Sequence, residues 1–154
     1  MAVRADALLI SAGLLAGIAA GGPADAEDVV AFRIENGAIP EPLTDSPGNP
    51  ARGRQIVRDM GHATCLICHA MPIPEEPDHG EIGPPLAGVG SRYTPGELRL
   101  RLVDPKSINP QTIMPSYYRV DDLYRVWGPY RDRPIYTAQQ IEDVVAYLAQ
   151  LRDN

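Results

Sequence analysis

Both cysteines of this 154-residue chain lie in one short motif, Cys65-Leu66-Ile67-Cys68-His69. Two thiols at this spacing bond to the two vinyl groups of a c-type haem, and the imidazole that follows them binds the iron. The motif therefore predicts one covalently attached haem c. Cys65 and Cys68 are its predicted attachment residues, and His69 is its predicted proximal iron ligand.

Two other interpretations of the cysteines explain less. A structural disulfide between Cys65 and Cys68 would enclose only two residues and would restrict the unfolded chain very little. A redox-active dithiol of the thioredoxin kind belongs to an alternating αβ sequence pattern, which this chain lacks, and it leaves His69 without a role. The covalent haem remains the interpretation that uses all three side chains.

The composition is consistent with a cofactor at the centre of the fold. The chain has 16 prolines and 14 glycines but one Phe and one Trp, which predicts long loops and few aromatic side chains for a core. A small domain of this kind usually needs a cross-link or a cofactor to be stable. We expect the haem to supply the apolar centre that the side chains do not.

The charge of the chain excludes some classes of partner. Its 14 basic and 20 acidic side chains give a net charge of −6, which disfavours nucleic acid. Thirteen of the basic residues are arginines and only Lys106 is a lysine. A carrier that docks through a ring of lysines is therefore excluded as well.

The first 26 residues have the pattern of an export signal. Arg4 precedes an apolar run over residues 7–20, and Ala24-Asp25-Ala26 is a typical cleavage site. The run is shorter than the roughly 20 residues that span a bilayer, so we expect cleavage and no membrane anchor. The expected organisation is a signal peptide over 1–26, an N-terminal arm over 27–48 and a domain over 49–154 in the periplasm.

Met114 is the predicted distal iron ligand. It lies 45 residues after His69 in a proline-rich loop, and this is enough chain to reach the other face of a haem. Met60 and Met71 are too near the motif to do so. The alternative for Met114 is ordinary core packing.

The remaining histidines and one turn complete the candidate site. His79, in an acidic loop, is expected to be solvated, although its ligation would give a bis-histidine centre of lower potential; His62, three residues before the motif, is given no role. A carbonyl of the turn Gly83-Pro84-Pro85-Leu86, with Pro84 as the candidate, is expected to accept the His69 imidazole N–H and to orient the ring. An ordinary rigid turn is the alternative.

Three helices can be predicted from caps and apolar spacing. Asn49-Pro50 begins a helix that runs to about Met60, with Ile56, Val57 and Met60 on its apolar edge. Capping boxes at Thr94 and Thr137 begin two more, the first ending before Asp104. Gly53 costs its helix about 1 kcal/mol relative to alanine, which indicates close approach of the C-terminal helix.

Taken together, these motifs resemble the class I c-type cytochromes, which implies an all-α fold of three to four helices and long loops around one haem. Four longer blocks are similar to the SoxX family, the small cytochrome subunits of SoxAX complexes in sulfur-oxidising bacteria. The resemblance covers roughly residues 49–152, and the blocks are 82–93, 103–110, 112–119 and 141–148.

The resemblance implies a function and a set of partners. A SoxAX complex joins thiosulfate oxidatively to a cysteine of the carrier SoxYZ, as an L-cysteine S-thiosulfotransferase, with the sulfur chemistry on SoxA. This chain would accept the released electrons and pass them to a small soluble cytochrome c. His69 and Met114 would ligate the iron, Arg92 is a candidate partner of a haem propionate, and no catalytic residue is expected.

Two further segments predict interaction surfaces. Residues 117–136 hold six of the nine aromatic residues, interleaved with four arginines. These residue types are enriched at interface hot spots, so we expect this segment to pack on the partner subunit or to frame the haem edge. Shielding of the haem within the monomer is the alternative. The stretch 27–48 is a candidate arm on a partner.

Two other functions compete with the electron-accepting subunit. One is a stand-alone periplasmic electron carrier, and the other is the cytochrome subunit of an unrelated dehydrogenase.

Overall fold

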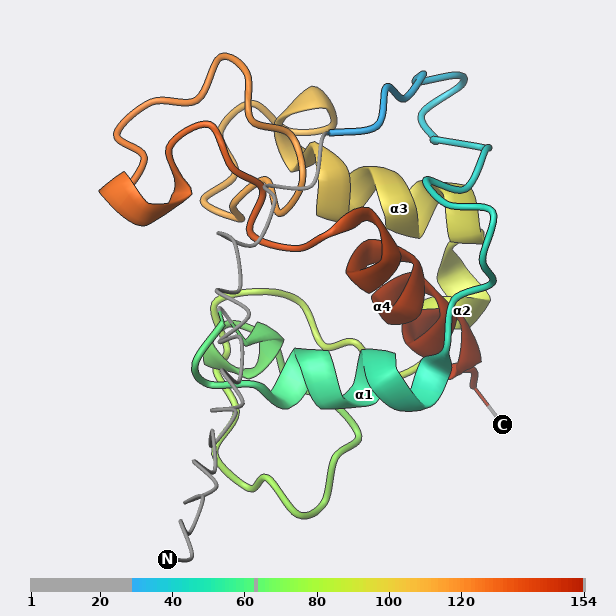
Figure 1. Cartoon of the computed structure of the whole chain (residues 1–154). Helices are drawn as coiled ribbons and strands as arrows, with labels where there is room; N and C mark the ends of the chain where they lie inside the picture. The colour runs from blue at the N-terminus through green and yellow to red at the C-terminus, as the bar shows by residue number, and fades with distance from the viewer. Residues whose placement is uncertain (1–28, 63, 154) are drawn as a thin grey trace, which may run out of the picture.

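The computed structural model describes residues 29–62 and 64–153, and the predicted signal peptide lies outside this range. Four α-helices, α1 Pro50–Arg58, α2 Val89–Arg92, α3 Pro95–Val103 and α4 Ala138–Gln150, are joined by long loops and short 3₁₀ turns (Figure 1). In the described residues, the single isolated extended pairing joins Glu35 and Ala38. The all-helical architecture agrees with the prediction. None of the described helices is long and apolar enough to cross a membrane.

Helix α1 begins as its sequence predicts and ends earlier. The Asn49 side chain accepts hydrogen bonds from the backbone N–H groups of Ala51 and Arg52 at 2.9 and 3.1 Å, and Pro50 occupies the first turn. The helix ends at Arg58 rather than near Met60. Met60 is 71% exposed and therefore does not belong to the apolar edge that we expected, because the chain turns away before reaching it.

The close approach predicted at Gly53 is confirmed. A Cβ atom there would clash with the backbone carbonyl of Asp143 and would lie 2.8 Å from the Tyr147 Cβ. Gly48, just before α1, is held equally close to Glu142 of α4. Helices α1 and α4 therefore pack backbone against backbone, which only glycine at these positions permits (Figure 1).

Capping boxes begin α3 and α4 as predicted. Thr94 and Glu97 exchange side-chain-to-backbone hydrogen bonds at the start of α3, and Thr137 and Gln140 do so at α4. Each helix then buries an apolar face in a common core, and α3 ends at Val103, before Asp104. The buried apolar side chains include Leu98, Leu100 and Leu102 of α3 and Ile141, Val144, Val145 and Leu148 of α4.

Two consecutive carboxylates of α4 bind arginines of the two neighbouring helices, α3 and α1. Glu142 is buried and accepts hydrogen bonds from the Arg99 guanidinium of α3 at 2.7 and 2.8 Å. Asp143 accepts from Arg52 of α1 at 2.7 and 3.0 Å. Helix α4 therefore holds α3 and α1 through charges as well as through its apolar face.

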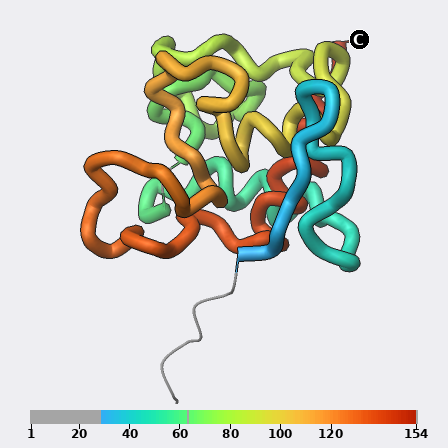
Figure 2. The backbone as a smooth tube through the Cα atoms, turned by 90° about the horizontal axis from the view of Figure 1, so that it is seen from above, coloured from blue at the N-terminus to red at the C-terminus, as the bar shows by residue number. Residues whose placement is uncertain are grey.

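The stretch before α1 packs in part on its own chain. Ile39 and Leu43 are buried in the core, and the Ile39 carbonyl accepts a hydrogen bond from Arg99 at 2.6 Å. The Leu43 N–H donates to Glu142 at 2.9 Å. Seen from above, this segment runs along the body of the molecule toward α1 (Figure 2). Val30 and Ile34 remain exposed.

Candidate functional site

A cavity of about 380 Å³ brings together residues from distant parts of the sequence. Cys65, His69 and Met114 all line it, as do Pro84 and Arg92. Most of the remaining wall is apolar. It is built by the turn after Pro84, by helices α2, α3 and α4, and by the loop that follows α3. The apolar residues in this wall are Leu86, Val89, Leu98, Leu102, Pro105, Tyr117 and Leu148.

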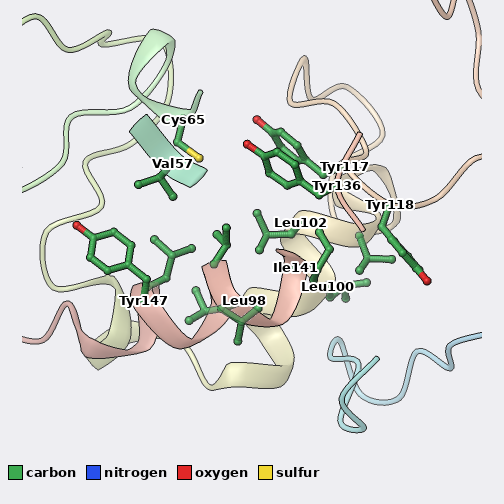
Figure 3. Close-up of a cluster of buried hydrophobic side chains, with 14 of the residues drawn as sticks. Val57, Cys65, Leu98, Leu100, Leu102, Tyr117, Tyr118, Tyr136, Ile141 and Tyr147 are labelled. Atoms are coloured by element: carbon green, nitrogen blue, oxygen red, sulfur yellow. The ribbon is translucent and has the colours of Figure 1, made fainter. Parts of the chain in front are cut away.

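The Cys65 thiol faces this cavity from a 3₁₀ turn, Cys65–Ile67. Thr64 caps the turn, and its hydroxyl donates to the Val57 carbonyl at 2.6 Å, which fixes the turn on α1. Both cysteines are free thiols, Cys65 buried and Cys68 half-buried. Burial raises the pKa of the Cys65 thiol to about 12, so the group is neutral at physiological pH. Figure 3 shows its sulfur pointing toward the space in front of the Tyr117 and Tyr136 rings.

His69 is oriented by the loop that follows it. Its Nδ1 donates a hydrogen bond to the Pro84 carbonyl oxygen at 2.8 Å, which is the bond expected from the sequence. The Gly83 N–H donates to the Cys68 carbonyl at 2.6 Å, so the loop closes directly over the motif. Because a carbonyl only accepts, Nδ1 carries the proton and Nε2 is left with its lone pair free for a metal.

Gly83 also belongs to this site. Its contact with the His69 imidazole was not predicted from the sequence. A Cβ atom at this position would lie 2.7 Å from His69 Nε2 and closer still to Nδ1 and Cε1 of the ring. The absence of a side chain is therefore what allows the loop to lie against the imidazole. The Gly83-Pro84 pair is the sequence feature from which such a close approach could have been predicted.

Met114 reaches the cavity on a loop that is fastened to α3. Its N–H donates to the Thr112 hydroxyl at 3.2 Å. The Tyr117 N–H donates to the Leu102 carbonyl at 2.9 Å, and Arg119 pairs with Asp104 at 3.1 Å. The chain that follows Met114 therefore lies along the C-terminal end of α3.

Two arginines line the cavity, and sequence analysis identified one of them. Arg92 donates to the carbonyls of Ala87 and Pro85 at 2.7 and 2.8 Å, so it braces the loop after His69. Its role toward a propionate stays a prediction. Arg101 has its guanidinium 3.6 Å from the centre of the Tyr93 ring and was missed. It alternates with buried leucines of α3, and nothing in that pattern distinguishes it from a solvated arginine.

The aromatic segment contributes one wall of the cavity region. Tyr117 and Tyr136 stack with ring centroids 4.8 Å apart and planes at 17°, and both are buried (Figure 3). Burial raises the pKa of both hydroxyls, so they stay protonated. Tyr117, at one end of the segment 117–136, therefore lines the cavity with Tyr136 stacked on it, whereas the middle of the segment does not line it.

The other sulfur and imidazole groups considered from sequence lie elsewhere. Met71 is buried in the core, and Met60 is exposed. His62 contacts Asp59 at 2.8 Å on the surface. His79 is half-buried rather than solvated, because its Nδ1 accepts the Met71 N–H at 3.2 Å. Among the described histidines and methionines, only His69 and Met114 line the cavity.

These residues fit a c-type haem. The cavity offers an apolar wall for a macrocycle, a thiol at its edge, and one imidazole and one thioether as iron donors. Imidazole nitrogen and thioether sulfur are the axial pair of cytochromes c. The ligand roles of His69 and Met114 and the attachment roles of the cysteines remain predictions that this geometry supports.

Comparison with known proteins places this site in context. The sequence profile of the cytochrome c family matches residues 50–152. Among solved structures, a chain in the crystal structure of SoxXA from P. pantotrophus is similar, with 36% identity and a TM-score of 0.71. The alignment covers 79% of this chain and 95% of that one. A search of curated proteins found no match.

Proposed function

The chain belongs to the cytochrome c family and is a SoxX-like electron-transfer cytochrome, and on this premise we propose that it is the electron-accepting monohaem subunit of a SoxAX-type complex. The observation that carries the proposal is that Cys65, His69 and Met114 line one largely apolar cavity. A periplasmic location forms part of the proposal, because residues 1–26 have the pattern of an export signal.

The residues of the cavity would hold the cofactor in a defined way. Cys65 and Cys68 would form the two thioethers, and His69 and Met114 would ligate the iron. A bound haem of this kind takes up and releases one electron at a time. The Pro84 carbonyl would keep the His69 ring in one orientation and strengthen its donation to the metal.

The remaining wall controls the environment of that centre. Buried leucines and the stacked Tyr117–Tyr136 pair exclude water from one side, and neutral tyrosines add no charge there. A dry site and a thioether ligand both favour the reduced form of an iron centre. The geometry therefore supports an electron acceptor of higher potential than a bis-histidine centre.

The sulfur chemistry belongs on a different subunit. If both cysteines are consumed by thioethers, this chain has no other thiol that could act as a nucleophile or carry sulfur. We therefore propose that thiosulfate is joined to the cysteine of a SoxYZ-type carrier on a SoxA-type partner. The conjugation releases two electrons, which this chain would accept one at a time.

An exit for electrons is proposed at the exposed edge of the site. Three isoleucines that neighbour site residues in sequence are exposed: Ile67 before Cys68, Ile82 before Gly83 and Ile113 before Met114. Exposed apolar side chains are typical of interaction sites where they gather in one patch, and we propose that these three do so at the haem edge. They support transient docking of a small soluble cytochrome c as the acceptor.

The test is a reduction assay with defined components. The oxidised holoprotein is mixed with thiosulfate alone, with a SoxA-type subunit, and with that subunit and SoxYZ together, and the absorption of reduced haem is followed. We expect reduction only in the complete mixture, and stable co-purification of this chain with the SoxA-type subunit. Reduction of the isolated chain by thiosulfate, or a chain that stays monomeric beside that subunit, would favour a stand-alone carrier instead.

A further inference from the structure

Residues 119–135 form a loop that projects from the body of the molecule, and we call it the Arg-aromatic loop (Figure 1, orange). Two of its aromatic side chains face solvent, Tyr124 with 90% and Trp127 with 72% of its surface exposed. The tyrosines on either side of the loop are buried. Large exposed aromatic side chains, and Trp and Tyr above all, contribute most to protein interfaces when a partner covers them.

The backbone of this loop has an unusual conformation. Asp122, Arg125 and Asp132 have positive φ angles of 53°, 58° and 59°. Among the described non-glycine residues only Asn36 shares this feature. Such conformations are uncommon outside glycine and tend to cluster at binding sites, where a fixed loop shape is required.

The Arg-aromatic loop and the chain just after Met114 enclose a groove of about 490 Å³. Four cationic side chains line it, Lys106, Arg119, Arg125 and Arg133, together with one carboxylate, Asp122. The chain as a whole carries a net charge of −6, so this groove has the opposite sign to the rest of the protein.

The cations of the groove are only partly neutralised by the chain itself. Arg119 pairs with Asp104, and Lys106 donates to the Thr112 carbonyl at 2.7 Å. Arg125 and Arg133 have no carboxylate within ion-pair distance in the described part of the chain. Two guanidinium groups are therefore available to an acidic partner.

A buried hydroxyl also lines the groove. Ser116 is 7% exposed, and its Oγ has no hydrogen-bond partner within the described residues. Buried polar atoms are nearly always satisfied, because leaving one without a partner costs free energy. An incoming carboxylate or backbone group would satisfy this one.

We propose that this groove is the docking site for an acidic segment of the SoxA-type partner subunit, an inference that rests on the proposed function. The exposed aromatic rim points to a protein, because a small ion would leave Tyr124 and Trp127 uncovered. The cationic side chains that line the groove favour a partner segment that carries carboxylates. Pro115 and Ser116 line the groove directly after Met114, so a protein bound there would lie beside the electron-accepting site.

The test measures the affinity of the holoprotein for the SoxA-type subunit by calorimetry. Trp127→Ala and Arg133→Glu are the test variants. Arg152→Glu is the matched control, because this exposed arginine lies at the C-terminal end, away from the Arg-aromatic loop (Figure 1), and the substitution changes the net charge equally. Retention of the haem spectrum shows that each variant is folded. We expect both test variants to bind at least ~10-fold more weakly, and Arg152→Glu to bind within about twofold of the wild type.

The salt dependence adds a second readout. Affinity of the wild type should fall as ionic strength rises, and Arg133→Glu should flatten that dependence. Wild-type affinity in both test variants would overturn the docking site while leaving the proposed function intact. A wild type that does not bind the subunit at all would overturn both.

Discussion

At the scale of single residues, the candidate site depends on how one imidazole is held. His69 lies between the Pro84 carbonyl, which accepts its Nδ1 proton, and the bare backbone of Gly83. The first contact fixes the tautomer and the second leaves no free space beside the ring. A small change at Gly83 should therefore be felt directly at the predicted iron ligand.

Gly83→Ala tests this contact. The new methyl group would lie 2.7 Å from His69 Nε2, so the ring or the loop must move, and the predicted bond to iron should weaken. We expect an altered haem absorption spectrum and either partial loss of ligation or a higher reduction potential, because weaker imidazole donation stabilises the oxidised iron less. Gly128→Ala is the control, because a Cβ atom there meets nothing within 4 Å. Identical spectra for the two variants would show that the Gly83 contact does not position His69.

Sequence analysis identified the residues whose roles can be predicted from their spacing along the chain. Cys65, Cys68 and His69 form one motif, and Met114 follows from the length of chain needed to return to the haem. Arg101 and Ser116 could not be found in the same way. Their roles depend on which side chains the folded chain places around them, and no local pattern encodes that.

At the scale of elements, α4 organises the molecule. Its apolar face packs in the core, while Glu142 binds α3 and Asp143 binds α1. The pKa of Asp143 is lowered in the folded protein. Burial alone would raise it, but hydrogen bonds from Arg52, the Asn49 N–H and Gln139 outweigh that effect.

The lowered pKa of Asp143 predicts a pH-dependent contribution to stability. A carboxyl whose pKa is lower in the folded state stabilises the fold above its ordinary value of 3.8, and this contribution is lost as pH falls through the folded-state value. We expect Asp143→Asn to be less stable than the wild type at pH 7, and the difference to narrow below about pH 4. Chemical denaturation of the holoproteins at several pH values measures it.

The control for this series is Asp45→Asn, a change at an exposed carboxyl before α1. It should differ little from the wild type at any pH. A gap between Asp143→Asn and the wild type that stays constant down to pH 3 would contradict the role given to the Asp143 carboxylate.

The elements themselves could be predicted where local signals exist. Asn49, Thr94 and Thr137 mark helix starts in the sequence, and the structure confirms all three. The burial of Glu142 and Asp143 was not predicted, because two adjacent carboxylates in a helix are usually solvated. They are buried here because arginines from two other helices meet them, which is information from tertiary structure.

At the scale of the whole molecule, long loops rather than helices position most residues of the candidate site. The loop after His69 closes over the imidazole, and the loop after α3 carries Met114 to the same cavity. The proline-rich and glycine-rich composition predicts such loops but not their paths. The division of residues 117–136 into buried ends and an exposed middle became visible only in the fold.

The central claim is that one haem is held in this cavity by His69 and Met114. The most direct test is the absorption spectrum of the oxidised holoprotein, compared with those of Met114→Ala and of Met60→Ala, a matched change at an exposed methionine. Sulfur ligation gives oxidised haem a weak band at the red end of the visible spectrum. We expect the band in the wild type and in Met60→Ala and its loss in Met114→Ala; a band that persists in Met114→Ala would contradict the account.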